Sequence, residues 1–424
     1  MNEPKFPTVI LGAGFVGLFT ALHLSHHRYN APVVLVDKND RFCFKPLLYE
    51  YLSGEMSSNQ VVPAYNILLK GSNVGFVQGT IQSVDLQQQQ VQLVDGTEYQ
   101  YENLVLALGS VPAFFAEGAR ENALSFQLQA DVDALKNQLQ TCLKQAVESD
   151  EPAKRSRLLT VVIVGGGPAG VELAMTLGDL LPNWYEAMGG LVSELRIVLV
   201  SRGDILKGDI NSHLGEVVKQ SMQERTVPIE LLIGASVTAI CPNAIEFVQN
   251  NQAERLEAET IIWTGGTNVN PLIKELVITQ EHRTKQGQLH VMPTLQLPDY
   301  PQVFAAGDCA AIIDPDNPGI TLPATAQVAY QQGRVIAHNI IARSRNHHLN
   351  PCHVALRGTL MKLGLGTGVA NLFDKYQIGG ARGHRIRHLT YLELLPTPLH
   401  NIVVTREWIR EKIFHLHAEQ SLRS

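Results

Sequence analysis

Cysteine is scarce in this chain of 424 residues, and no two cysteines lie close together. The five are scattered at Cys43, Cys142, Cys241, Cys309 and Cys352, and no C-x-x-C occurs. A disulfide framework is unusual in a chain this large, so a reducing compartment is expected. The missing C-x-x-C argues against a dithiol reductase, an iron–sulfur centre and a zinc ribbon.

An excess of positive charge and long apolar runs are absent as well. The 34 lysines and arginines are outnumbered by 40 acids, and the net charge of -6 gives no support to nucleic-acid binding. No apolar window long enough for a transmembrane helix occurs. The short polar stretch before Thr8 does not resemble a signal peptide. We therefore expect a cytoplasmic protein that is soluble or bound to a membrane surface.

Histidine is common, but its two adjacent pairs give no metal signature. The pairs His26-His27 and His347-His348 are adjacent, whereas a helical zinc site places its ligands one turn apart. We predict no metal. Apolar residues make up 45% and charged residues 17%, which is typical of a globular protein with a large core. The length suits two or three domains.

The first informative motif follows an apolar strand near the N-terminus. The strand over 9–11 leads into Gly12-x-Gly14-x-x-Gly17, an amphipathic stretch over 18–24 and a second strand over 33–36. In a dinucleotide-binding turn these glycines allow a tight turn, approach of the pyrophosphate and close helix packing. Asp37 ends the second strand, where an acid bonds a ribose hydroxyl, and Lys38 follows it. Residues 1–115 thus begin with a nucleotide site.

A second copy of this design starts at Thr160. Gly165-x-Gly167-x-x-Gly170 opens another helix, and a strand over 195–200 ends in Ser201-Arg202. An acid at that place favours NAD, whereas an arginine can pair with the 2′-phosphate of NADP. Arg202 therefore favours NADPH, although a solvated arginine with bound NADH remains the alternative. Two fingerprints imply two nucleotide sites in an α/β protein with two Rossmann-like domains.

Three further motifs resemble the two-dinucleotide-domain flavoproteins with the glutathione-reductase-like fold. Tyr101-Glu-Asn-Leu-Val-Leu-Ala-Leu-Gly109 is similar to their strand that closes the FAD domain, including Ala107 and Gly109. Val303-Phe-Ala-Ala-Gly-Asp-Cys309 resembles the FAD motif, in which the acid, here Asp308 after Gly307, contacts the ribityl chain. Ile261-Ile-Trp-Thr-Gly-Gly266 resembles the end of the nicotinamide domain and adds Gly265 and Gly266. The resemblance assigns FAD to the first site.

This order predicts a discontinuous first domain. FAD binding is expected in 1–115 and 291–343, NAD(P)H binding in 116–290, and membrane association or dimer contact in 344–424. A polar helix is expected over 131–148 and a charged linker over 150–157. A small β meander should use strands over 74–84 and 91–93, with Asp95-Gly96 as a hairpin turn.

Two segments resemble the type II NAD(P)H:quinone oxidoreductases. Phe44-Lys-Pro-Leu-Leu48 is similar to their loop beside the flavin, so the resemblance implies flavin contacts for Pro46 and Leu47. Lys45 would shield negative charge that develops on the flavin or the quinone. The alternative is that Lys45 is a solvated lysine of the loop. Cys43 stands alone here, as packed filler or, less favoured, a catalytic thiol.

The other segment is Thr325-Ala-Gln-Val-Ala-Tyr-Gln-Gln-Gly333, which looks like the quinone-site helix of the same family. The resemblance places Ala326 and Gln327 at the flavin ring, and Tyr330 and Gln331 in the quinone pocket. The positive end of this helix would stabilise reduced flavin. A plain amphipathic helix is the alternative.

The tail resembles the cyanobacterial and plastid branch of this family. Its matching segments are Thr359-Leu-Met-Lys-Leu-Gly-Leu-Gly366, Tyr391-Leu-Glu-Leu-Leu-Pro-Thr-Pro-Leu-His400 and Thr405-Arg-Glu-Trp-Ile409. The branch implies NADPH and reduction of demethylphylloquinone in phylloquinone biosynthesis. Apolar residues at Ile402, Ile409, Ile413 and Leu416, with basic Arg382, Arg385 and Arg387, suit an interfacial helix beside anionic lipid. Packing on the core or on a dimer partner is the equal alternative.

The resulting expectation is a peripheral, FAD-dependent and non-proton-pumping NAD(P)H:quinone oxidoreductase on the cytoplasmic face of a thylakoid or plasma membrane. Glu172, close after the second glycine motif, would contact the nicotinamide carboxamide or help proton movement; helix-terminus stabilisation is its alternative role. A respiratory NADH:plastoquinone dehydrogenase, a soluble reductase of disulfides or small electron carriers, and a slow redox sensor remain as alternatives. The family's frequent dimers make a homodimer an expected assembly.

Overall fold

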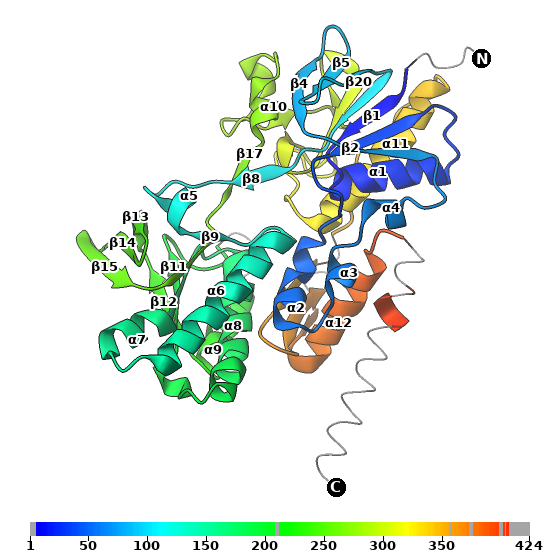
Figure 1. The fold of residues 1–424 in the computed structure, drawn as a ribbon. Coiled ribbons are helices and arrows are strands. Elements are labelled where there is room, and N and C mark those ends of the chain that lie inside the picture. The colour runs from blue at the N-terminus through cyan, green and yellow to red at the C-terminus, as the bar shows by residue number, and fades with distance from the viewer. Residues whose placement is uncertain are drawn as a thin grey trace.

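The computed structural model describes residues 6–207, 212–356, 358–372, 376–397, 402 and 404–406. It contains two α/β units, each built on a mainly parallel sheet, with a smaller C-terminal segment lying against both (Figure 1). Within the described ranges, no helix is long and apolar enough to cross a membrane.

The first sheet combines strands from distant parts of the chain. Its order is β19 (Gln296–Leu297), β20 (Tyr300–Ala305), β7 (Asn103–Leu106), β1 (Thr8–Leu11), β2 (Val33–Asp37) and β3 (Val74–Gln78). β1 is fully buried and pairs in parallel with β2 and β7, as continuous apolar strands do in two-sided sheets. The helices α1 (Phe15–His26) and α11 (Ala326–Ser344) pack along each other on this unit, so the two stretches of chain share one core.

The second sheet repeats this plan. Its order is β12 (Ile229–Ile233), β11 (Arg196–Ser201), β10 (Thr160–Val164), β16 (Thr260–Trp263) and β9 (Leu124–Ser125), with all neighbours parallel. Around it lie α6 (Gln129–Glu148), α7 (Pro152–Leu159), α8 (Pro168–Ala187) and α9 (Ser212–Gln223). An antiparallel sheet of β13 (Ser236–Cys241), β14 (Ala244–Gln249) and β15 (Gln252–Glu257) adjoins it (Figure 1).

Strands that cross between the units connect the two sheets. β8 (Ser110–Pro112) pairs antiparallel with β17 (Thr267–Val269), so the chain leaves and re-enters the first unit along one ribbon (Figure 1). The shorter elements nearby are α5 (Ala119–Asn122), α10 (Pro271–Glu275), β18 (Leu289–His290) and β21 (Ala310–Ala311).

Three local expectations can be compared with this fold. The polar helix over 131–148 is confirmed as α6, which begins two residues earlier, and the Asp95-Gly96 turn is confirmed by Gly96 at φ +87°. The single strand over 74–84 is wrong: β3 joins the large sheet, while β4 (Ile81–Asp85) pairs with β5 (Gln90–Leu93) and through it with β6 (Glu98–Gln100).

The charged linker over 150–157 is also wrong, because these residues form most of α7. Proline fits the first turn of a helix, and Pro152 stands there. Arg157 then pairs with Glu259 at 2.9 Å, and Leu158 and Leu159 are buried. The charged residues therefore cover one face of a packed helix.

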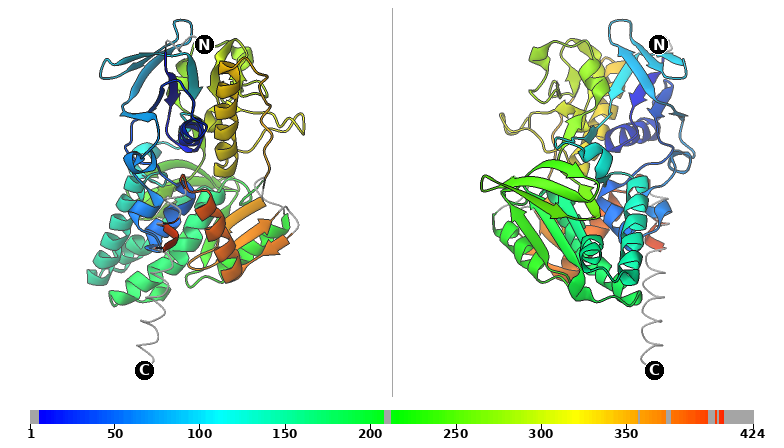
Figure 2. Two further views of the ribbon diagram at one scale, coloured as in Figure 1. Left: turned by 90° about the vertical axis from the view of Figure 1, so that its right-hand side faces the viewer. Right: turned by 60° about the vertical axis from the view of Figure 1, so that its left-hand side comes forward.

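The C-terminal segment folds into a small sheet and one helix. The strands β22 (Gly358–Lys362), β23 (Gly368–Leu372) and β24 (Tyr376–Ile378) are antiparallel, and α12 (Gly380–Glu393) covers them. This segment lies beside α8 and beside the short helices α2 (Leu48–Ser53) and α3 (Ser58–Val61) (Figures 1 and 2). Most of the expected interfacial helix, including Ile409, Ile413 and Leu416, lies outside the described residues.

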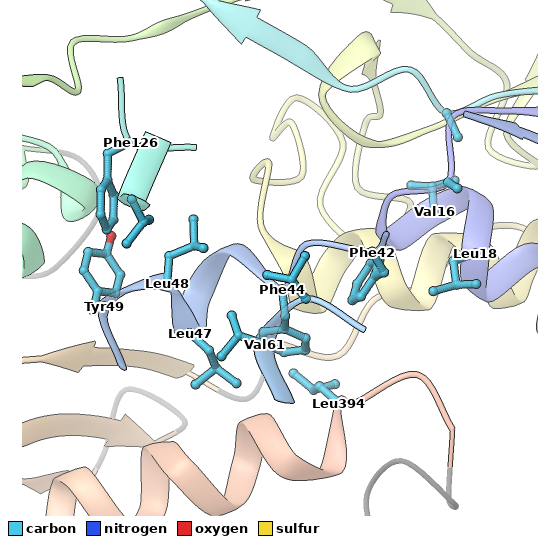
Figure 3. Close-up of a cluster of buried hydrophobic side chains, with 14 of the residues drawn as sticks. Val16, Leu18, Phe42, Phe44, Leu47, Leu48, Tyr49, Val61, Phe126 and Leu394 are labelled. Carbon is cyan, nitrogen blue, oxygen red and sulfur yellow. The ribbon is translucent and has the colours of Figure 1, made fainter. Parts of the chain in front are cut away.

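Apolar side chains join the loop after β2 to both neighbours. Phe44 and Val61 face Leu394 at the end of α12, while Tyr49 lies against Phe126, with ring centroids 5.2 Å apart (Figure 3). All five side chains are buried. The loop that the sequence relates to the flavin is therefore held between the second unit and the C-terminal helix.

Candidate active site

In the first glycine turn, Gly12 and Gly17 are tightly packed, whereas the space beside Gly14 is open. A Cβ on Gly17 would lie 1.8 Å from the carbonyl oxygen of Gly12, and Gly12 itself has φ +91°. By contrast, a Cβ on Gly14 would meet nothing within 4 Å. Open space at the start of α1, beside unpaired helix N–H groups, is what a pyrophosphate requires. The turn therefore fits a dinucleotide.

Asp37 lies directly beside this turn. Its Oδ2 accepts from the amide of Ala13 at 2.7 Å, and its Oδ1 accepts from the amide of Asn39 at 2.8 Å. These bonds hold the carboxylate at the carboxyl end of β2, where a ribose of a bound dinucleotide would lie. The side chain of Lys38 is exposed, and its carbonyl accepts from Gln78.

The segment after β20 that resembles the FAD motif reaches the same edge of the first sheet. β20 pairs with β7, which brings Gly307 and Asp308 close to Gly109 and Ser110. The hydroxyl of Ser110 donates to Asp308 Oδ2 at 2.6 Å, and Gly307 donates its amide to Gln332 Oε1 at 2.9 Å. A small hollow lies between this motif and the start of α11, lined among others by Gly307, Thr325, Val328 and Gln332. Ala107, which follows β7 directly, is buried behind the first glycine turn.

The second glycine turn has the same form. A Cβ on Gly170 would lie 1.9 Å from the carbonyl oxygen of Gly165, whereas a Cβ on Gly167 would meet nothing within 4 Å. Gly165 has φ +128° and packs against Thr264 and the amide of Gly265, and Gly266 follows with φ +83°. A second dinucleotide therefore fits at the start of α8.

At the end of β11 the side chains of Ser201 and Arg202 diverge. Ser201 is buried, and its Oγ packs so closely on Gly166 that a Cβ there would lie 2.3 Å away. Arg202 is exposed. The nearby Asp204 pairs with Lys219 at 3.0 Å, so its charge is partly balanced. An arginine is thus available where the adenosine ribose of the second nucleotide would lie.

The polar side chains of α11 turn toward two different neighbours. Gln327 donates to the carbonyl of Gly358 at 3.2 Å, and Gln331 exchanges two bonds with the backbone of Ala355, at 3.0 and 3.1 Å. Tyr330 instead packs edge-on against Phe19 of α1, with ring centroids 4.6 Å apart. Ala326, the first residue of the helix, is half-buried. The two glutamines thus attach the C-terminal segment to the expected flavin side.

Glu172 is a buried acid in the second turn of α8. Its Oε1 accepts from the amide of Lys362 at 2.6 Å and lies 3.7 Å from Arg387 Nη2. Burial raises the pKa of Glu172 to about 7, although the charge of Arg387 opposes this shift. Because α8 begins at Pro168, Glu172 lies beyond the first turn, where stabilisation by the helix terminus falls off. A carboxyl group that titrates near neutral pH can hold or release a proton during turnover.

Around Glu172 lies a buried charge cluster, which consists of Glu50, Lys362 and Arg387 and which sequence reasoning missed. Glu50 forms ion pairs with both cations: Arg387 contacts its Oε1, and Lys362 Nζ lies 3.4 Å from the same atom. Lys362 also pairs with the half-buried Glu55. Each member of the cluster is at most 1% exposed.

Burial of Arg387 overturns its expected place in a lipid-facing basic patch. Arg385 and Arg382 of the same helix are exposed, but the guanidinium of Arg387 points inward and donates to the carbonyl of Pro46 at 2.6 Å. The available sequence signals were single charges inside apolar runs, as in Leu360-Met-Lys-Leu363 and Leu47-Leu-Tyr-Glu-Tyr-Leu52. For Arg387, adjacent arginines concealed that signal.

Two remaining candidates near the flavin loop differ in exposure. Burial raises the pKa of the Cys43 thiol to about 11, so the thiolate needed for catalysis is scarce at neutral pH. Lys45 is exposed at the start of the short helix η1 (Lys45–Leu47), in which Pro46 is half-buried and Leu47 is buried.

Metal-ligating side chains do not gather at this site. Across the described ranges, no group of three or more His, Cys, Asp or Glu residues is arranged to hold a metal ion. One contact between histidines joins His27, directly after α1, and His338 of α11, with their Nε2 atoms 3.1 Å apart.

The fold and both nucleotide turns define a class that comparison with known proteins identifies. Residues 6–333 match the family model described as pyridine nucleotide-disulphide oxidoreductase, so the chain belongs to this family. The chain is 33% identical to demethylphylloquinone reductase NdbB of Synechocystis over 96% of this chain and 97% of the relative. It is 30% identical to the alternative NAD(P)H-ubiquinone oxidoreductase C1 of Arabidopsis thaliana, over 96% and 81%.

Solved structures show the same fold. NDH2 of Plasmodium falciparum in complex with NADH superposes with a TM-score of 0.84 at 18% identity, over 96% of this chain and 98% of that one. Within the wider family, the chain is a member of the type II NAD(P)H:quinone oxidoreductases. The expectation of a flavin- and nicotinamide-dependent oxidoreductase is thereby confirmed.

Proposed function

We propose that this protein uses NADPH and bound FAD to reduce a membrane quinone by two electrons, with demethylphylloquinone as the substrate. The observation that carries the proposal is the pair of glycine turns, each open at its central glycine, on two separate sheets. The likeness to a demethylphylloquinone reductase supports the choice of quinone.

FAD is assigned to the first turn and NADPH to the second. Asp37 and Asp308 would hold the two ribose-like parts of FAD, because both carboxylates lie at the carboxyl edge of the first sheet. Arg202 would pair with the 2′-phosphate of NADPH, and Ser201 would shape the turn beside it. The glycines after β16, Gly265 and Gly266, would leave room for the nicotinamide ribose.

In this proposal the residues of the chain bind and orient the two nucleotides and supply charge around them. A bound flavin would supply the redox chemistry, which is acceptance of a hydride from the nicotinamide and delivery of two electrons to the quinone. The amides at the start of α11, near Ala326 and Gln327, would face the electron-rich edge of the flavin. Glu172 would orient the nicotinamide or hold a proton for the quinone, and Lys45 would offset negative charge from the solvent side.

Contact with the bilayer completes the proposal, because long-chain quinones reside there. The C-terminal region after α12 would lie on a thylakoid or plasma membrane at its cytoplasmic face, and a homodimer would be its assembly. Tyr330 and Gln331 would border the quinone path. The bonds of Gln331 to Ala355 would connect that path with the C-terminal segment.

Steady-state assays with matched substrates test this function. Purified flavoprotein is given NADPH or NADH, with a demethylated naphthoquinone or a plastoquinone analogue as acceptor. Higher kcat/KM for NADPH with the naphthoquinone is expected. Preference for NADH and plastoquinone would assign the protein to respiratory electron flow, and slow turnover with every quinone would favour the redox-sensor alternative.

A further inference from the structure

The buried charge cluster joins three parts of the chain at one point. Glu50 comes from α2 beside the flavin loop, Lys362 from β22 and Arg387 from α12. The Arg387 guanidinium lies between the carboxylates of Glu50 and Glu172 and stacks over the ring of Tyr391 at 4.8 Å. Its bond to the carbonyl of Pro46 also reaches the expected flavin-contacting loop.

Stability alone does not account for this arrangement. Two buried polar atoms, Glu50 Oε2 and Arg387 Nε, have no hydrogen-bond partner among the described residues. A buried ion pair of imperfect geometry is often no more stabilising than well-packed apolar side chains of similar volume. These charges are buried although the burial adds little stability, and they lie beside an acid in the expected reaction centre. Such an arrangement suits a role in the reaction.

We propose that Arg387 and Glu50 are positioning residues, which orient the carboxylate of Glu172 and balance its charge during turnover. The inference deepens the proposed quinone-reductase function and rests on it. In this arrangement Arg387 acts directly on Glu172, whereas Glu50 acts through Arg387 by holding part of its positive charge. The C-terminal helix α12 is thereby a component of the reaction centre.

The electrostatics of the cluster support this division of roles. Charged and titratable groups act on Glu172 from three elements: Tyr49 and Glu50 on α2, Lys362 on β22, and Arg387 and Tyr391 on α12. The buried His384 of α12 also interacts with Glu50, Lys362 and Arg387, and burial lowers its pKa. Burial raises the pKa of Glu172, Arg387 and Lys362 lower it, and Glu50 raises it. Burial would also raise the pKa of Glu50, but the charges of Arg387 and Lys362 outweigh it, so Glu50 stays ionised.

These signs predict opposite effects for the two members of the pair. Arg387→Met removes the cation, so Glu172 keeps its proton to higher pH. Glu50→Gln removes an anion and leaves Arg387 free to pair with Glu172, so Glu172 loses its proton at lower pH. General damage to the fold would not move the ionisation of Glu172 in opposite directions in the two variants.

The test is the pH profile of kcat for the flavin-loaded enzyme with NADPH and a water-soluble quinone. We expect a wild-type inflection near pH 7, an upward shift of about one pH unit or more in Arg387→Met and a downward shift in Glu50→Gln. A shift of one unit corresponds to about 1.4 kcal/mol of interaction between Glu172 and the residue that is replaced. KM for NADPH should change less than kcat. Arg387→Lys keeps a cation and should restore most of the wild-type inflection.

Matched controls come from an exposed pair of the same chemistry. Arg255 pairs with Glu246 at 3.0 Å on the surface, so Arg255→Met and Glu246→Gln should leave the inflection in place. Arg387→Met can also reduce folding, in which case Glu50→Gln and Arg387→Lys still decide the outcome. Shifts in the same direction for Glu50→Gln and Arg387→Met, or no shift in Glu50→Gln, would overturn the proposal.

A second readout separates this inference from the function on which it rests. Infrared difference spectra can follow the protonated carboxyl band of Glu172, identified by its loss in Glu172→Gln, without any quinone. If no quinone is reduced but that band titrates with the expected opposite shifts, the positioning roles stand and the acceptor assignment fails. If quinone is reduced and the band does not respond to either variant, the positioning roles fail.

Discussion

The contrast between glycines within each nucleotide turn yields a sharp prediction. Gly14→Ala adds a methyl group where nothing lies within 4 Å, and the residue has an ordinary backbone conformation with φ −69°. Folding should therefore tolerate it. The added methyl occupies the space assigned to the pyrophosphate, so flavin content should fall strongly. Gly17→Ala places Cβ 1.8 Å from a backbone oxygen, which neither chain segment can easily relieve. Overpacking commonly costs about 1–3 kcal/mol, and we expect the upper end or more here.

The assay measures flavin per protein by absorbance after gel filtration, together with the urea midpoint of the cofactor-free protein. Gly14→Ala should lose flavin with a nearly unchanged midpoint, whereas Gly17→Ala should lose both. The same contrast in the second turn should spare flavin: Gly167→Ala should raise KM for NADPH, and Gly170→Ala should also destabilise. Gly215→Ala, in α9 with open space around it, is the control and should be neutral or slightly stabilising. Normal flavin content in Gly14→Ala would refute the placement of the pyrophosphate.

Three further predictions follow from single side chains. Arg202→Ala should raise KM for NADPH roughly 10- to 150-fold and change KM for NADH little, because charge-assisted bonds contribute about 1.5–3 kcal/mol; equal effects on both nucleotides would contradict the 2′-phosphate contact. Cys43→Ala should keep most quinone-reductase activity, because at a pKa of about 11 the thiol stays protonated at pH 7; a loss beyond tenfold, measured as kcat, would make this residue catalytic. Arg225→Met should lower the free energy of unfolding, measured in urea, by about 1.5–3 kcal/mol. The reason is that the Arg225 guanidinium pairs with Asp179 at 3.0 Å and donates to the carbonyl of Leu363 at 2.9 Å. A change no larger than that of the exposed Arg255→Met would show that this link between α8 and the C-terminal segment adds no stability.

The sequence predicts the parts of this protein that depend on local spacing. Each glycine turn needs glycine at fixed positions between a strand and a helix, so both turns and their strands can be located from the chain alone. The helix over 131–148 is also recognisable, because it too depends on a local pattern along the chain. The charged segment over 150–157 is misjudged, because its helical character depends on packing of Leu158 and Leu159 against the second unit.

The charge cluster could not be predicted, because its partners are far apart in the chain. Arg387 and Glu50 are separated by 337 positions, and the amide of Lys362 bonds to Glu172 across 190. A lone lysine in an apolar strand signals burial but does not name its partner. The run Arg382, Arg385 and Arg387 suggests one basic surface, yet the helical arrangement turns Arg387 inward and leaves the other two exposed.

Single-turnover kinetics under anaerobic conditions test the central claim most directly. The purified flavoprotein is reduced with one equivalent of NADPH in a stopped-flow instrument, and a demethylated naphthoquinone is then added while the flavin absorbance is recorded. Fast bleaching followed by fast reoxidation is the result that the two-site account predicts. Bleaching without reoxidation by any quinone would contradict it.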